Sequence, residues 1–146
     1  MKKITTTLGI GVDILKISRF DKMINKPGRG LDSLFVEKLG SRILHPIHEL
    51  PVFKSLLKTQ DSSKVTKYLA GNWAMKEAIY KTLDESDQKF FQFNQWFKLY
   101  NERGKPDISN DDYHKPEEFL LSISHDEDVL VATVLRQEVN YYGKEK

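Results

Sequence analysis

Two carboxylates far apart in the sequence, Asp13 and Glu77, are the residues best suited to chemistry in this chain of 146 residues. Asp13 follows a short apolar run and Glu77 lies in a segment rich in helix formers, so folding could bring the two together. Such a pair suits magnesium, which keeps several waters and completes its octahedron with substrate phosphates. Lys76 and Lys81, a turn or less from Glu77, could neutralise those phosphates. The pattern therefore indicates magnesium-assisted phosphoryl chemistry.

Simpler interpretations stay open for these and other polar residues. Glu77 and Lys81 are four positions apart, so they also suit an ion pair on a partly exposed helix. Ser124 and His125, near a strand end, suit either phosphate contact, which we favour, or a hydrogen-bonded turn. A hydrolase triad is disfavoured there, since the Gly-x-Ser-x-Gly pattern of a nucleophile elbow is missing.

Length and composition indicate one domain over residues 1–146, with the 39% hydrophobic and 30% charged residues of an ordinary soluble globular protein. No apolar run approaches the length that spans a bilayer, so we expect no membrane association. Cysteine is absent, which removes disulfides, thiolate metal sites and a cysteine nucleophile, and favours an intracellular compartment. The net charge of +2 does not by itself imply nucleic acid, and we expect no nucleic-acid partner.

A central helix and an early strand must position the two carboxylates. Residues 68–83 lack proline and are rich in helix formers, and their apolar side chains fill three arcs of the helix, the pattern of a helix surrounded by protein. Residues 7–12 are short, apolar and β-compatible, which predicts a buried strand that ends at Asp13. Gly9 and Gly11 lie inside this strand rather than in a phosphate-binding loop, so they are expected to admit another backbone or a ligand at close range.

The whole pattern predicts an α+β fold, a small antiparallel sheet packed against the long buried central helix. Residues 14–26 should form an amphipathic helix whose basic face suits either solvent or an acidic partner and consists of Lys16, Arg19, Lys22 and Lys26. Two further helices are predicted: one at 32–39, capped by Asp32 and ended by Gly40, and one at 46–58, kinked at Pro51. Strands are predicted at 90–101, 119–124 and 129–135, and the last two should form a hairpin. His45 and His48 are expected at the surface, and the polar tail from residue 137 is expected to fray.

Two spaced motifs in this sequence resemble the signature of the 4′-phosphopantetheinyl transferases, in the short holo-acyl-carrier-protein synthase type. They are Gly9-Ile-Gly-Val-Asp13 and Trp73-x-x-Lys-Glu77-x-x-x-Lys81. Further landmarks follow in the same order as in that family: Arg42-Ile-Leu, Tyr68-Leu-Ala-Gly71, Gly104-Lys-Pro106 and Ser122-Ile-Ser-His125. The resemblance covers roughly residues 8 to 136, and the pair of motifs is far more specific than either alone.

The resemblance implies transfer of 4′-phosphopantetheine from coenzyme A to a serine of an apo acyl carrier protein, with release of 3′,5′-ADP, in support of fatty acid synthesis. Asp13 and Glu77 would bind magnesium, and either Glu77 or a water held by Asp13 would deprotonate the serine. Lys81 would stabilise charge on the phosphates with help from Lys76. The implied contacts to coenzyme A are Lys105, Ser124 and His125. The basic face of residues 14–26 would then dock the acidic carrier.

Size and departures from the family pattern add further expectations. Members that act as monomers contain two such halves, so this chain, with one, is expected to form a homotrimer with its sites at subunit interfaces. Asn72 stands where bacterial members commonly have arginine, so one cationic contact is missing or comes from elsewhere. This departure from the bacterial pattern favours a mitochondrial eukaryotic member over one from the bacterial cytoplasm. A different class of function, a non-catalytic acyl-carrier-protein-binding subunit that keeps the fold, remains the alternative.

Overall fold

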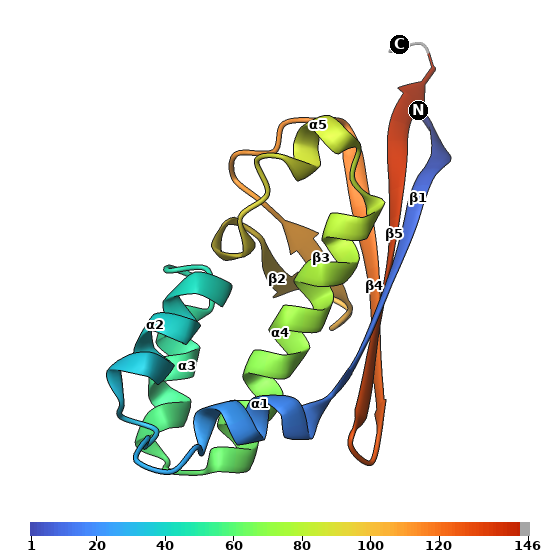
Figure 1. Ribbon diagram of the computed structural model, residues 1–146. Helices are drawn as coiled ribbons and strands as arrows, with labels where there is room; N and C mark the ends of the chain where they lie inside the picture. The colour runs from blue at the N-terminus through green and yellow to red at the C-terminus, as the bar shows by residue number, and fades with distance from the viewer. Residues whose placement is uncertain (144–146) are drawn as a thin grey trace.

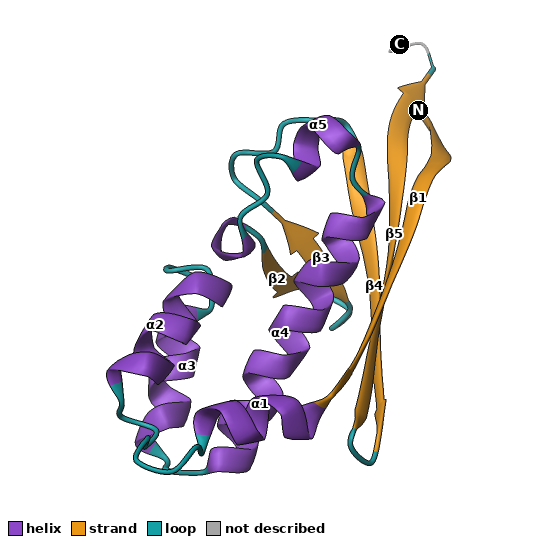
Figure 2. Ribbon diagram, in the orientation of Figure 1, coloured by secondary structure: helices purple, strands orange, loops and turns teal. Residues whose placement is uncertain are grey.

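A five-stranded antiparallel sheet, with one long helix lying across one of its faces, is the framework of the computed structural model, which describes residues 1–143 (Figure 1). The strand order is β1-β5-β4-β3-β2. The helices gather on one side of the sheet (Figure 2), which confirms the α+β class. In chain order the elements are β1 (Lys2–Lys16), α1 (Ile17–Ile24), α2 (Leu34–Ile43), α3 (Leu50–Lys58), α4 (Ser62–Thr82), α5 (Glu85–Gln88), the 3₁₀ turn η1 (Phe93–Gln95), β2 (Phe97–Tyr100), β3 (Pro106–Ser109), β4 (Glu117–Asp126) and β5 (Val129–Tyr142).

Helix α4 is the buried centre of the molecule, as the sequence predicts, and it begins at Ser62. Asp61 caps its N-terminus by accepting a hydrogen bond from the backbone N–H of Lys64 at 3.2 Å. Its fully buried apolar side chains lie on several arcs, between the sheet and helices α1 to α3, and are Val65, Leu69, Ala70, Ala74, Met75, Ala78 and Ile79. No helix within residues 1–143 combines the length and apolar character needed to cross a bilayer.

Two glycines let β1 lie directly against α4. A Cβ at Gly11 would stand 2.0 Å from the carbonyl oxygen of Ala78, and one at Gly9 would stand 2.8 Å from that of Thr82. No side chain fits at these distances, so the predicted close approach is confirmed, and the neighbour is the backbone of α4. The contact places Asp13, at the next inward-facing position of β1, against the helix.

Strands β1 and β5 are longer than predicted. β1 continues to Lys16, so the amphipathic helix α1 begins at Ile17 rather than at residue 14. β5 continues to Tyr142, and residues 137–142 pair with the start of β1. The expectation that the tail frays is therefore wrong over residues 137–142, because pairing satisfies the backbone of this polar segment. Residues 144–146 of the predicted tail lie outside the described residues.

Glycine and proline mark different points in α2 and α3 than the sequence predicts. Gly40 lies inside α2 rather than at its end. Glycine is needed at this position because a Cβ would stand 2.5 Å from the Phe53 ring. The cap of α2 is Ser33, whose hydroxyl accepts a hydrogen bond from the first turn, and not Asp32. Pro51 stands in the first turn of α3, so the helix starts at this point and is not kinked there.

The aromatic segment 90–101 forms a strand only at its end, where β2 begins with the buried Phe97. The rings of His45 and His48 pack on Phe97, with centroid separations of 4.6 and 4.0 Å. His45 is therefore buried, contrary to the surface position expected for it, and burial lowers the pKa of its imidazole.

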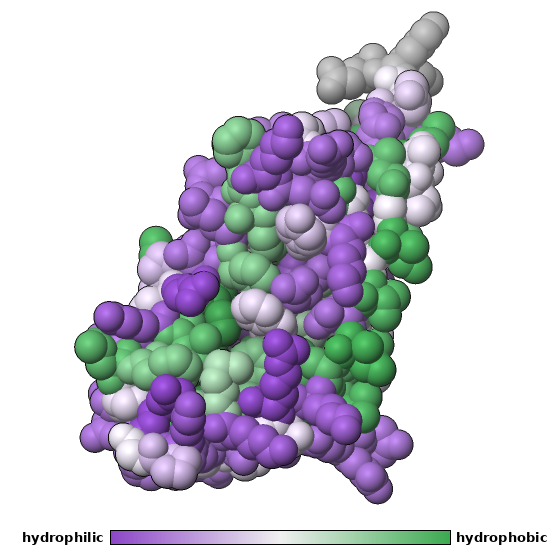
Figure 3. Space-filling view, in the orientation of Figure 1, coloured by the Kyte–Doolittle hydropathy of each residue, from purple (hydrophilic) through white to green (hydrophobic). Residues whose placement is uncertain are grey.

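The face of the sheet opposite α4 is apolar and uncovered in the single chain. Ile10, Val12 and Ile14 of β1 project from it, and Ile14 is 67% exposed. Their partners in register on β5 include Leu135 and Val131, which share the same face. Figure 3 shows hydrophobic residues along this edge of the molecule. Apolar surface of this kind is typical of an interface with another protein.

Candidate active site

Lys81 joins α4 to the end of β1. Its ammonium donates to Asp13 Oδ1 at 3.2 Å and to the carbonyl oxygen of Val12 at 2.8 Å. Among the described residues Lys81 forms its ion pair with Asp13 and not with Glu77, so the simpler interpretation as a pair within one helix is wrong. The fold thus brings together two of the residues that the sequence predicted for the site.

Asp13 and Glu77 lie close enough for their charges to repel. Burial raises the pKa of the Glu77 carboxyl and the charge of Asp13 raises it further, while Lys81 and Arg19 act in the opposite direction. Asp13 Oδ2 is buried and has no hydrogen-bond partner among residues 1–143. A buried carboxylate oxygen without a partner, beside a second carboxylate, is a suitable ligand for a cation.

The donor set available to a metal is small. Within the described residues no group of three or more His, Cys, Asp or Glu side chains is placed to hold a metal ion. Such a small set is compatible with magnesium, which binds proteins through one or two carboxylates and takes its remaining ligands from water and substrate phosphates. Asp13 and Glu77 are the two carboxylates that could hold it.

The raised pKa of Glu77 predicts an effect on stability whose sign can be worked out. Folding favours the neutral carboxyl, so ionised Glu77 penalises the folded state, and the penalty disappears as the pH falls through the raised pKa. We expect Glu77→Gln, which cannot ionise, to be more stable than wild type at about pH 7 and to lose that advantage by about pH 4. Urea unfolding without divalent cations measures the difference at each pH. An advantage that grows as the pH falls would contradict the raised pKa.

The structure corrects the role predicted for Lys76. Its ammonium is fully buried and donates to Glu49 Oε1 at 2.5 Å and to the carbonyl oxygen of Ile43 at 2.6 Å. Glu49 Oε1 also accepts the backbone N–H of His45 at 2.9 Å. Burial lowers the pKa of Lys76, and the charge of Glu49 opposes this shift. Because no external phosphate reaches this ammonium, Lys76 holds α4 against the connection between α2 and α3 and does not assist Lys81.

A groove of about 280 Å³, here called the basic groove, lies between the first half of α4 and the sheet. Its basic side chains are Lys67 of α4, Lys98 of β2 and His125 of β4, and its apolar residues are Ile17, Ile123 and Leu130. The groove thus contains one residue predicted to contact coenzyme A, His125. The two lysines were not predicted, because no motif distinguishes them from ordinary surface lysines.

Ser124 and Lys105 do not line the basic groove. Ser124 pairs with Val131 and His125 with Leu130 across the same two strands. Side chains alternate between faces along a strand, so Ser124 projects from the open face of the sheet and His125 from the face covered by α4. Within one chain the two side chains therefore lie on opposite faces of the sheet, and their contacts to coenzyme A stay predictions. Lys105 is exposed in the turn between β2 and β3.

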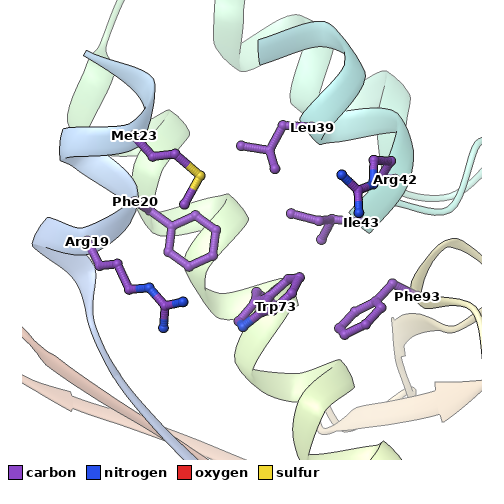
Figure 4. A pocket seen from close by; sticks show the side chains of 8 residues that line it. All are labelled: Arg19, Phe20, Met23, Leu39, Arg42, Ile43, Trp73 and Phe93. Atoms are coloured by element: carbon purple, nitrogen blue, oxygen red, sulfur yellow. The ribbon is translucent and has the colours of Figure 1, made fainter. Parts of the chain in front are cut away.

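A second pocket, here called the apolar pocket, lies between α1, α2 and α4 and has a volume of about 220 Å³ (Figure 4). Trp73 of α4 lies at its centre and stacks on Phe93 with ring centroids 4.6 Å apart. Arg19 and Arg42 stand on opposite sides of it. The remaining lining residues are Phe20, Met23, Leu39 and Ile43. Trp73 is one helical turn from Glu77, so the apolar pocket adjoins the carboxylates.

The basic residues predicted around α1 are all exposed: Lys16, Arg19, Lys22 and Lys26. The turn between β4 and β5 holds the start of this helix in place. Asp128 accepts hydrogen bonds from the backbone N–H of Ser18 at 2.8 Å and from its hydroxyl at 2.6 Å. These bonds satisfy an N–H of the first turn and fix the start of α1, where Arg19 lies near enough to Glu77 to lower its pKa.

Comparisons with known proteins agree with this arrangement. The family model of the 4′-phosphopantetheinyl transferase superfamily matches residues 9–134. A holo-[acyl-carrier-protein] synthase of Mycoplasma mobile is 36% identical over 131 residues, which cover 90% of this chain and 91% of that protein. A solved holo-(acyl-carrier-protein) synthase from Bacillus anthracis, in complex with CoA (3′,5′-ADP), is 27% identical, with a TM-score of 0.65 and coverage of 90% of this chain and 97% of that one. Holo-ACP-synthase from Plasmodium yoelii shares the fold, with a TM-score of 0.70 at 24% identity and coverage of 94% and 99%.

The chain belongs to the 4′-phosphopantetheinyl transferase superfamily. Within it, the chain is of the holo-acyl-carrier-protein synthase type, because relatives of that name match along most of its length. The resemblance inferred from the two motifs is thereby confirmed.

Proposed function

We propose that this protein is a holo-[acyl-carrier-protein] synthase, which transfers 4′-phosphopantetheine from coenzyme A to a serine of an apo acyl carrier protein in support of fatty acid synthesis. The observation that carries the proposal is the meeting of Asp13, Glu77 and Lys81 at one place in the fold. The name of the Mycoplasma mobile relative and the coenzyme A complex of the Bacillus anthracis protein support the same reaction.

Each residue of the site has a distinct task in the proposed reaction. Asp13 and Glu77 would hold magnesium, which supplies positive charge against the diphosphate of coenzyme A. Lys81, held beside Asp13, stabilises negative charge on the phosphates. Glu77, whose raised pKa improves it as a base, or a water held by Asp13, takes the proton of the carrier serine. The serine oxygen bonds to the β-phosphorus as the bond from that phosphorus to the bridging oxygen breaks, and the electron pair leaves with 3′,5′-ADP.

One experiment tests the reaction directly. The protein is incubated with coenzyme A, magnesium and an apo acyl carrier protein, and the carrier is then weighed by mass spectrometry. A gain equal to phosphopantetheine, lost when magnesium is chelated, is the expected result. The alternative function, a non-catalytic carrier-binding subunit, predicts a complex with the carrier but no gain in mass. That outcome would contradict the proposed synthase.

The basic residues around α1 are the proposed docking site for the carrier, since acyl carrier proteins are acidic. Arg19→Glu is expected to raise the KM for the carrier by about tenfold or more, because it opposes encounter with an acidic surface. The KM for coenzyme A should stay nearly unchanged. Arg19 acts on the Glu77 carboxyl, so Lys22→Glu, farther along α1, serves as a second variant. Lys54→Glu, on the exposed side of α3, is the control, and equal effects on both substrates would remove the assignment.

We also propose a homotrimer, supported by the uncovered apolar face of the sheet. The basic groove and the carboxylates occupy different parts of α4, so a neighbouring chain could bring the groove of one protomer to the carboxylates of another. Light scattering should give three times the chain mass, and Ile10→Asp on the apolar face should lower it together with activity. Full activity at monomeric mass would contradict the trimer.

A further inference from the structure

The basic groove combines positive charge with apolar surface. Lys67 and Lys98 line it, and neither forms an ion pair with a carboxylate among residues 1–143. Ile123 and Leu130 lie in neighbouring strands and turn their side chains toward α4. Cations beside apolar surface suit a ligand that joins a phosphate to a flat or hydrophobic group, and a phosphorylated nucleoside has both parts.

Gly71 provides independent support that the groove is kept open. It lies inside α4, where glycine weakens a helix relative to alanine because it has more backbone freedom to lose. Gly9, Gly11 and Gly40 each stand where a Cβ would collide with a neighbour, but a Cβ on Gly71 would meet nothing within 4 Å. Packing therefore does not require glycine at this position. The missing side chain instead leaves space in the groove that Gly71 lines.

Asn72 also lines the groove, but it brings no charge to it. Its amide nitrogen already donates to the carbonyl oxygen of Tyr68, one turn earlier, at 3.0 Å. Within residues 1–143 the Lys98 ammonium lies over the face of Tyr100 on the same strand, 5.3 Å from the ring centroid. This contact is weak and lets the ammonium turn toward a bound anion. Lys98 is thus the lysine that the sheet contributes to the groove.

We propose that Lys98 binds the 3′-phosphate of coenzyme A in the basic groove and makes the enzyme prefer coenzyme A over its 3′-dephospho form, in place of a cation at position 72. The inference rests on the proposed function. The diphosphate of coenzyme A belongs with Asp13, Glu77 and Lys81, where the reaction occurs. The phosphate that remains is attached to adenosine, whose base suits the apolar side of the groove.

Calorimetric binding of coenzyme A and of 3′-dephospho-coenzyme A to the whole protein tests the proposal without depending on turnover. A charge-assisted hydrogen bond to phosphate corresponds to about a ten- to hundredfold difference in affinity, so wild type should bind coenzyme A more tightly by about that factor. Lys98→Ala should remove most of the preference by weakening coenzyme A alone. Lys54→Ala, outside the groove, should leave both affinities unchanged. An unchanged preference in Lys98→Ala would overturn the proposal.

Two further variants separate this role from a general loss of structure. Asn72→Arg, added to Lys98→Ala, should restore much of the preference, because it returns a cation to the groove from α4. Gly71→Ala should weaken binding of coenzyme A while raising the melting temperature by about 2–4 °C. Failure of the rescue, or tighter binding by Gly71→Ala, would count against the assignment. Coenzyme A bound with the expected preference but never transferred would contradict the proposed function and leave this inference standing.

Discussion

Glu77→Ala is expected to reduce kcat for phosphopantetheine transfer by about 10³-fold, because it removes both a proposed magnesium ligand and a candidate base. The fold should survive the change. Burial and the charge of Asp13 raise the pKa of Glu77, which means that its ionised carboxylate is an unfavourable neighbour in the folded protein. Loss of activity without loss of stability is therefore the specific result to look for, measured by the rate of carrier mass gain and by urea unfolding of the same sample.

Matched variants show whether Glu77 acts together with Asp13. Asp13→Asn alone should cost a similar factor, and the double variant should be scarcely worse than either single one, because groups that act as a unit lose their effect together. Glu85→Ala, on the exposed helix α5, provides the control for removing a carboxylate. Multiplying losses in the double variant would show that the two carboxylates act separately and would remove the shared cation from the mechanism.

The part of the site that the sequence predicted depends on local signals. Gly9 and Gly11 lack side chains, and this alone allows β1 to lie on the backbone of α4. The composition of residues 68–83 favours a helix whatever surrounds it. Together these two features bring Asp13 and Lys81 into contact, so the expectation that the two spaced motifs meet at one place follows from local signals.

Other features of the fold and the site depend on partners that local patterns do not reveal. Ser124 and His125 are adjacent in a motif, but only the strand register shows that they project to opposite faces. Lys98 enters the basic groove because β2 lies at the far end of the sheet order, which no periodicity indicates. The length of β5 likewise depends on its pairing with β1 over residues 137–142, a polar stretch without an apolar pattern of its own.

Lys76 was predicted to assist Lys81 at the phosphates, but its ammonium is buried in an ion pair with Glu49. A lysine on a helix buried on several arcs requires an acidic partner, because an ion is costly to desolvate. The sequence therefore contained a signal for a buried ion pair, and Glu49 supplies the partner. What the sequence could not show is that the connection between α2 and α3 folds back to place Glu49 there.

Lys76→Met is expected to lower the free energy of unfolding by about 3–5 kcal/mol, the largest effect on stability that we predict. The Nζ atom of Lys76 is fully buried, and its removal leaves the carboxylate of Glu49 in the interior, where its one remaining partner among residues 1–143 is the backbone N–H of His45. It also removes the bond to the carbonyl oxygen of Ile43. Urea unfolding of wild type and variant, at one protein concentration because an oligomer unfolds in a concentration-dependent way, measures the loss.

Removing both partners distinguishes an uncompensated charge from lost packing. Lys76→Met combined with Glu49→Leu should recover most of the stability lost in Lys76→Met, because no unpaired charge remains in the core. Lys115→Met, which breaks the exposed pair with Asp87, should change stability little, since water solvates the partner that is left. The rate of phosphopantetheine transfer by the same variants provides the second measurement, because Lys76 immediately precedes Glu77 on α4. A Lys76→Met protein as stable as wild type would mean that the ammonium is not needed to hold α4 against the connection between α2 and α3.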